Sequence, residues 1–207
     1  CSSVESKRLA KITRNHLSLT SKQYRQMLSK LRVKINVLER LMSANEWDRI
    51  EFDKIPSKAG LVYKNAFARR DIIAKKYEAF AKDKTTKVNA KALYPYEIVE
   101  QANKCAYTSL DNVDRLMVNK YWESLPDYLN GADCSMMCVV DTSGSMWGTP
   151  IDVAISLGMY CAERLNGPFK NNYISFASRP QLINIEGVDF VDKVNRIYRT
   201  NLCDNTN

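Results

Sequence analysis

Asp141, Ser143 and Ser145 form an Asp-x-Ser-x-Ser pattern directly after an apolar run. This alternating spacing lets a tight loop turn one carboxylate and two hydroxyls toward a common point, with Gly144 relieving the backbone and Gly148 ending the turn. Hard oxygen donors of low total charge suit Mg²⁺, or Mn²⁺, with room left for other ligands. The pattern therefore predicts a divalent-cation site with an open coordination position.

The elements around this loop follow the order strand, loop, helix, strand. Residues 134–140 form a short apolar run, which favours a strand buried on both faces. Thr149 can cap the next helix, with Pro150 in its first position and Asp152 completing a Thr-x-x-Asp box. Strands are expected at 173–177 and 182–185, and Asp189 opens a further helix. This order is typical of an open α/β sheet, which binds ligands at the carboxyl ends of its strands.

In the first 130 residues, the apolar residues are spaced as in helices. Apolar residues spaced by three and four run from Tyr24 to Met42, and a capping box of Thr20 and Gln23 begins that helix. Further helices are expected at 57–69, 71–82, 95–104 and 111–122. We therefore expect an all-helical region at 1–130, followed by an α/β domain at 131–207.

Basic charge is confined to the first region. Residues 1–130 hold 25 Lys and Arg against 15 Asp and Glu, whereas residues 131–207 hold 6 against 8. Such an excess attracts polyanions, so nucleic acid is a candidate partner. The basic residues off the apolar stripe, which we take as RNA-binding candidates, are Lys22, Arg25, Lys30, Arg32 and Arg40. The alternative is that these side chains only solvate helix faces.

Several stretches carry a resemblance to known proteins. The run from Val139 to Met146, followed by Gly148-Thr149-Pro150, resembles the first strand and metal-ion-dependent adhesion site of a von Willebrand factor A-type (vWA) domain. Residues 38–47, 66–69 and 92–99 resemble a largely uncharacterised family that joins a basic helical, TROVE-like region to such a domain. That architecture is similar to the Ro ribonucleoprotein autoantigens, in which a helical-repeat ring binds small non-coding RNA.

This resemblance implies a fold and a set of ligands. It implies an open, mostly parallel, Rossmann-like sheet, incomplete at the C-terminus because the sequence stops before the later strands. Asp141, Ser143 and Ser145 match the first metal loop, and Thr206 stands where the family places its second-loop threonine. The aspartate of the third loop has no counterpart in the sequence. An acidic group on a protein partner would complete the site, and Trp147 would border the partner surface or, alternatively, pack on the sheet as a lid.

Other function classes lack their motifs in the sequence. No phosphate-binding glycine loop, Gly-x-Ser-x-Gly elbow or grouped Cys and His ligands occur, and no general acid or base is visible beside Asp141. We therefore expect a binding protein rather than an enzyme. No run of apolar residues is long enough to cross a bilayer and no signal peptide is evident, so we expect a piece of a longer intracellular, cytoplasmic protein with reduced cysteines and no membrane partner. Metal-dependent capture of a protein is the leading hypothesis, and Ro-like RNA binding by the helical region is the alternative.

Overall fold

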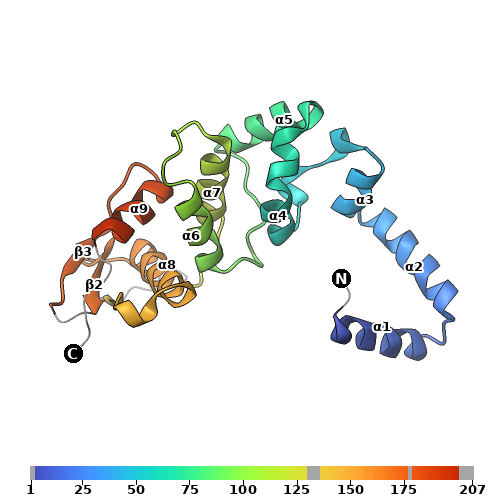
Figure 1. Cartoon of the computed structure of the whole chain (residues 1–207), viewed down its shortest axis with the longest axis horizontal. Coiled ribbons are helices and arrows are strands. Elements are labelled where there is room, and N and C mark those ends of the chain that lie inside the picture. Colours follow the sequence, from blue (N-terminus) through green and yellow to red (C-terminus); the bar gives the residue numbers. More distant parts are fainter. Residues whose placement is uncertain (1–2, 130–135, 177–178, 201–207) are drawn as a thin grey trace. The chain divides into compact units, whose positions relative to one another are not determined.

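The structure is a computed structural model that describes residues 3–129, 136–176 and 179–200 (Figure 1). The chain falls into two compact units, Cys1–Ile50 and Glu51–Asn207. The predicted boundary at residue 130 lies inside the second unit and next to undescribed residues, so it stays a prediction. The described part is mostly helical, with one small mixed sheet.

The first unit is built from helices, and its buried apolar side chains are Leu38, Leu41, Trp47 and Ile50. Its elements are α1 (Val4–His16), α2 (Ser21–Lys34), α3 (Leu38–Ser43) and the 3₁₀ turn η1 (Trp47–Arg49). The capping box at Thr20 is confirmed, since its hydroxyl accepts from Gln23 and the Gln23 side chain accepts from the Thr20 backbone. The apolar stripe is divided between two helices, because Asn36 adopts a φ of 48° between α2 and α3. Helix α1 has no counterpart in the sequence prediction.

Four helices begin the second unit. They are α4 (Ser57–Arg69), α5 (Asp71–Lys82), α6 (Pro95–Lys104) and α7 (Val113–Glu123), preceded by the turn η2 (Phe52–Lys54). The bounds of α4, α5 and α6 are those predicted. Helix α7 begins later than predicted because Asn112 caps it, accepting hydrogen bonds from the next backbone amides. Phe52, Phe67 and Tyr77 pack as an aromatic cluster with centroids 5.0–5.5 Å apart.

The second part of this unit holds the sheet. Its elements are β1 (Cys138–Asp141), the turn η3 (Gly144–Met146), α8 (Thr149–Arg164), β2 (Asn172–Phe176), β3 (Leu182–Asn184) and α9 (Phe190–Thr200). Strand β1 pairs with β2 in parallel and β2 pairs with β3 antiparallel, so the sheet is mixed rather than mostly parallel. Only residues 177–181 join β2 to β3, and a parallel connection needs a crossover of a dozen or more residues.

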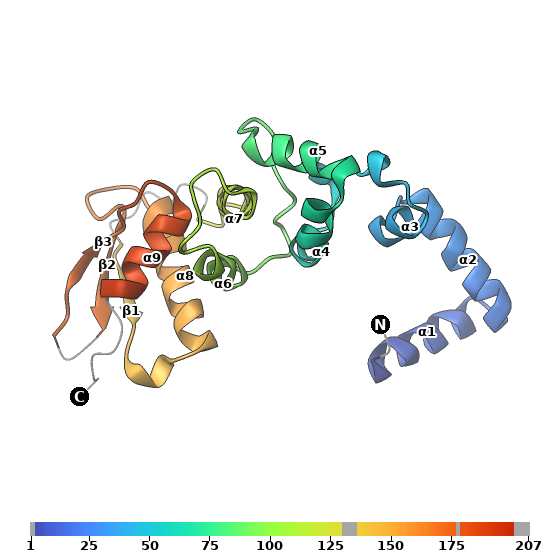
Figure 2. The ribbon, with the colours of Figure 1, turned by 45° about the horizontal axis from the view of Figure 1, so that its top comes forward.

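Helices α8 and α9 lie between the three strands and the α6–α7 pair (Figure 2). On the helix side of the sheet, Val140 and Tyr173 are buried. On the other side Val139, Ile174 and Leu182 stand in one row across the strands, and Val139 is 61% exposed. The expectation that β1 is buried on both faces is therefore wrong for the described residues.

Close packing fixes α8 against β1. A Cβ built on Gly158 would lie 2.3 Å from Cγ2 of Val140, so only glycine allows this approach of helix to strand. The approach holds the end of β1, and with it Asp141, in a fixed relation to α8.

Polar and aromatic contacts join the helices to the α/β part. Asp189 caps α9 by accepting from the Asp192 amide, and it forms an ion pair with Arg115 of α7. Trp122 of α7 stacks on Phe190 of α9 with a centroid distance of 4.1 Å. Among the described residues, no helix is long and apolar enough to cross a bilayer.

Candidate metal centre

The Asp-x-Ser-x-Ser loop lies at the carboxyl end of β1. Asp141 is the last residue of the strand, and the loop leads through η3 into α8. Strand β1, helix α8 and the parallel strand β2 form a βαβ unit, and the carboxyl ends of its strands are where open α/β sheets bind ligands. The sequence prediction of a loop in this place is confirmed.

Two hydrogen bonds link the three predicted residues. The Ser143 amide donates to Oδ1 of Asp141 at 2.9 Å, and the hydroxyl oxygens of Ser143 and Ser145 are 3.1 Å apart. Ser143 is 2% exposed, whereas Ser145 is exposed. The cluster therefore has a buried side and a side open to solvent.

The donor set fits a hard divalent cation. In an octahedral Mg²⁺ site with bonds of about 2.1 Å, neighbouring ligand oxygens lie about 3 Å apart. The 3.1 Å separation of the Ser143 and Ser145 hydroxyls is of that size, and the nearby Asp141 carboxylate carries the negative charge. These residues present one carboxylate and two hydroxyls, a donor set suited to Mg²⁺ or Mn²⁺.

The remaining metal predictions have different outcomes. Thr206 lies outside the described residues, so its place in the site stays a prediction. Within residues 3–129, 136–176 and 179–200 no cluster of three or more His, Cys, Asp or Glu could hold a metal ion. The loop is of another kind, with one carboxylate and two hydroxyls. Burial, followed by the neighbouring Cys161, raises the pKa of Cys138, so this thiol stays protonated at neutral pH.

The backbone of the loop differs from the prediction in two places. Gly148 adopts a φ of 90°, as a turn-ending glycine should, but Gly144 has no positive φ and no neighbour near a built Cβ. Thr149 does not cap α8, because it is the first helical residue and Gly148 takes the cap position without a side-chain bond. Asp152 instead accepts a hydrogen bond from the Tyr198 hydroxyl, which ties the first turn of α8 to α9.

Two exposed aromatic side chains flank the loop. Trp147 is 70% exposed and follows η3 directly, as the prediction of a bordering residue requires. Phe176 is paired with Asp141 in the β1–β2 register and is 52% exposed. Sequence reasoning missed Phe176, although its place at the end of the next parallel strand was a usable signal.

The predicted RNA-binding residues lie on the first unit. Lys22, Arg25, Lys30 and Arg32 are exposed, and none of them forms an ion pair with a carboxylate of the described residues. Arg40 is half-buried and lies 3.5 Å from Glu46, so its charge is partly neutralised within the unit. Four of the five candidate side chains are therefore available to an anion.

Comparison with known proteins defines the family. Residues 2–132 match the family described as a domain of unknown function, DUF2828. The chain belongs to the DUF2828 family. Residues 135–207 match a second domain of unknown function, DUF7788.

A relative of this DUF2828 protein is uncharacterized protein L728 of Acanthamoeba polyphaga mimivirus. The two are 36% identical over 202 residues, which cover 90% of this chain and 34% of the relative. The chain therefore spans about a third of the length of the curated relative it matches. No solved structure matches the chain.

The DUF2828 and DUF7788 matches meet inside one compact unit. The DUF2828 match includes α6 and α7, which pack against α8 and α9 of the DUF7788 match. The ion pair of Arg115 with Asp189 and the stacking of Trp122 on Phe190 both join the two matches. The last helices of the DUF2828 match thus support the α/β part that carries the Asp-x-Ser-x-Ser loop.

Proposed function

We propose that this DUF2828 protein is a non-enzymatic binding protein. Asp141, Ser143, Ser145 and Thr206 would hold Mg²⁺ or Mn²⁺, which captures an acidic group of a protein partner. The observation that carries the proposal is the 3.1 Å approach of the Ser143 and Ser145 hydroxyls beside Asp141, at the carboxyl end of a parallel strand. When bound, the ion would supply an open coordination position that a carboxylate can fill.

The proposal includes the fold of the α/β part and the location of the protein in the cell. The βαβ unit of β1, α8 and β2 supports an open, Rossmann-like vWA-type sheet that begins near residue 131. The joining of a helical region to this sheet supports the proposed likeness to the Ro architecture. We also place the protein in the cytoplasm, in keeping with the free thiols of Cys105, Cys138 and Cys161.

The loop's own residues would orient the partner. The Ser143 amide donates to one carboxylate oxygen of Asp141 and so helps to orient that carboxylate within the loop. Ser145 lies on the exposed side and marks the direction of approach. Trp147 and Phe176 supply apolar surface beside that opening. The best-matched partner segment is therefore an Asp or Glu with apolar neighbours.

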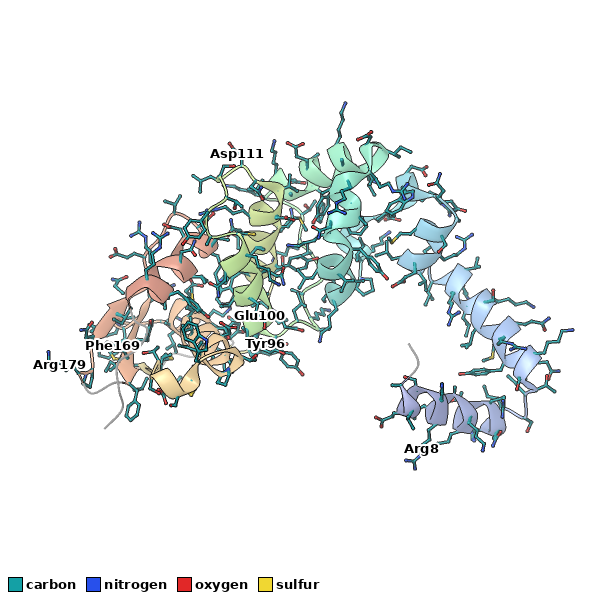
Figure 3. The ribbon with its side chains drawn as sticks, viewed as in Figure 1. Arg8, Tyr96, Glu100, Asp111, Phe169 and Arg179 are labelled. Carbon is teal, nitrogen blue, oxygen red and sulfur yellow. The ribbon has the colours of Figure 1, made fainter. Side chains whose placement is uncertain are left out.

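Calorimetry with Mg²⁺ on the full chain tests the metal site. We expect a saturable heat for the wild type and its loss in Asp141→Ala. Asp111→Ala is the matched control, because Asp111 is an exposed aspartate on the loop between α6 and α7 (Figure 3). Equal heats for wild type and Asp141→Ala would overturn the metal site.

RNA binding by the helical region is a second candidate function. The observation that favours it is the charge of the first unit, where residues 1–50 hold 11 Lys and Arg against 4 Asp and Glu. Phosphate neutralisation by such a unit supplies affinity that falls with salt. Structured or small non-coding RNA is the proposed ligand, and the α/β part would then serve as a structural or protein-contact module.

Salt and chelator separate the two functions. RNA retention by the full chain in a filter-binding assay should fall steeply with ionic strength and be unaffected by EDTA. Metal-dependent capture should be abolished by EDTA and respond weakly to salt. Absence of RNA retention at low salt would remove the second candidate and leave the first untouched.

A further inference from the structure

A cleft of about 310 Å³ lies between α1 and α2 in the first unit. Its walls include four cationic side chains, two neighbouring polar ones and no carboxylate. These six residues are Lys7, Lys11, Arg14, Ser21, Tyr24 and Arg25. Sequence reasoning considered only Arg25 among the cations, because α1 itself was not predicted.

The turn between the helices builds this cleft. The Thr20 capping box starts α2, and Ser18 adopts a φ of 52° to reverse the chain after α1. Arg14 donates from Nη1 to the Ser21 hydroxyl at 2.6 Å, which joins the two walls. Figure 1 shows the two helices diverging from this turn. The cleft is therefore set by local bonds within the first unit.

The charges in the cleft repel one another. Lys7, Lys11 and Arg14 are spaced by four and three along α1, so they share one helical face. None of these three, nor Arg25, forms an ion pair with a carboxylate of the described residues. Like charges at this spacing destabilise a helix, and a bound anion would relieve that repulsion.

A second basic cleft lies toward the other end of α2. It measures about 670 Å³, and its walls include Arg32 and Arg40 together with one carboxylate, Glu39. Arg25 and Arg32 are seven residues apart, or about 10 Å along a helix. Glu39 and the Arg40–Glu46 pair offset much of the charge of the second cleft, so Arg32 is its exposed cation. A further cation at this distance from the first cleft fits a ligand with repeated negative charges better than a single small anion. Tyr24, in the wall of the first cleft, offers a ring for base stacking.

We propose that the α1–α2 cleft binds backbone phosphates of a single-stranded nucleic acid. This inference rests on the second proposed function and gives it a location. Lys7, Lys11 and Arg25 contact the phosphates as charges, and Arg14 both contacts them and keeps the turn in place. These contacts do not involve the 2′-hydroxyl. The binding of RNA and the binding of single-stranded DNA of the same sequence should therefore depend equally on the cleft residues.

Two charge-matched variants of the full chain test the site. The cleft variant is Lys7→Gln, Lys11→Gln and Arg25→Gln, which leaves the Arg14 bond to Ser21 intact. The control variant is Arg8→Gln, Lys34→Gln and Lys84→Gln, which removes the same charge from exposed side chains that line neither cleft and are not among the RNA-binding candidates. The side chain of Arg8 points away from α2 (Figure 3). Circular dichroism and thermal unfolding establish that both variants keep the wild-type fold.

The readout is fluorescence anisotropy of a labelled 12-nucleotide uridine-rich RNA across a salt series. We expect the cleft variant to lose about tenfold more affinity than the control, and its log–log salt slope to fall by about 2 for three lost phosphate contacts. The matching single-stranded DNA should show the same loss.

Three outcomes would overturn the proposal. Equal losses in the cleft and control variants would reject this site while leaving RNA binding in place. No binding of the 12-nucleotide RNA by the wild type would reject the site, whereas the second proposed function would be rejected by the absence of RNA retention in the filter-binding assay. Cleft-dependent binding of anionic phosphatidylserine vesicles without cleft-dependent binding of RNA would show that the cleft serves a membrane surface instead.

Discussion

The guanidinium of Arg115 on α7 donates hydrogen bonds of 2.7 Å from Nε and Nη2 to the two carboxylate oxygens of Asp189. The side chains are 7% and 17% exposed, and Asn119 donates to the same carboxylate at 2.9 Å. Such a planar, two-bond pair is among the stronger polar contacts in proteins. Because Asp189 also caps α9, the pair connects the end of the DUF2828 match to the α/β part.

Removing Asp189 should therefore destabilise the second unit. Asp189→Ala leaves the Arg115 guanidinium buried without its partner, and breaking a buried pair in this way costs about 3 kcal/mol. Urea unfolding at pH 7 measures the loss, with Asp111→Ala as the control for removing an exposed aspartate. A loss as small as that of the control would show that the pair does not support the unit.

The Arg115–Asp189 pair should also make the stability of the second unit depend on pH in the acidic range. Burial acts to raise the pKa of Asp189, but the hydrogen bonds from Arg115, the Asp192 amide and Asn119 outweigh it, and the pKa lies below its usual value of 3.8. The folded state then binds fewer protons than the unfolded state, so this contribution is present above the usual pKa and is lost as pH falls through the folded pKa. The stability difference between wild type and Asp189→Asn should be constant above about pH 5 and shrink below pH 3.8. A difference independent of pH would contradict this assignment.

Gly158 should be required to position the Asp-x-Ser-x-Ser loop. In Gly158→Ala the added methyl would lie 2.3 Å from Val140, so α8 or β1 must shift. Overpacking costs about 1–3 kcal/mol, of which about 1 kcal/mol is offset by the better helix propensity of alanine. We expect a net loss of about 1 kcal/mol in the free energy of unfolding and a weaker Mg²⁺ heat.

Gly144→Ala is the matched comparison for this substitution. Gly144 has no positive φ and no neighbour within 4 Å of a built Cβ. The free energy of unfolding of Gly144→Ala should therefore differ from that of the wild type by less than about 0.5 kcal/mol. Equal stability of the two variants would show that the α8–β1 approach tolerates a methyl group.

Local signals in the sequence predicted most of the helices. Helices α4, α5 and α6 have the predicted bounds. The signals that predicted them, the spacing of apolar residues and a proline at the first helical position, are contained within each helical segment. The antiparallel β2–β3 pair was open to prediction from the five residues of its connection. Helix α1 was missed although it has a local N-terminal signal, since Ser3 caps it by accepting a hydrogen bond from the Ser6 amide.

The candidate site divides in the same way. The proximity of Ser143 and Ser145 follows from their spacing in one loop, so the sequence was sufficient to predict it. The pairing of Arg115 with Asp189, by contrast, joins residues 74 apart in the sequence. Such relations arise from tertiary packing, which no local pattern in a single sequence specifies.

Trp147 provides a direct report on partner binding. Trp147 is 70% exposed, whereas Trp47 and Trp122 are each 4% exposed. Acrylamide quenching of the protein's fluorescence therefore samples Trp147 selectively. An acidic partner segment would bind at the Asp-x-Ser-x-Ser loop and place its own apolar side chains on Trp147 and Phe176. Its binding should then shield the Trp147 ring from the quencher.

The probe is acetyl-Leu-Asp-Leu-amide, with acetyl-Leu-Asn-Leu-amide as its neutral match. In the presence of Mg²⁺ we expect the aspartate peptide to lower the quenching constant by about half, because binding removes much of the exposed ring surface from solvent. The asparagine peptide should have no effect, since an amide is a weaker ligand than a carboxylate for a hard cation. EDTA and Asp141→Asn should each abolish the shielding. Shielding that persists in EDTA would mean that the peptide binds the aromatic surface alone, and the metal would then have no part in recognising the partner.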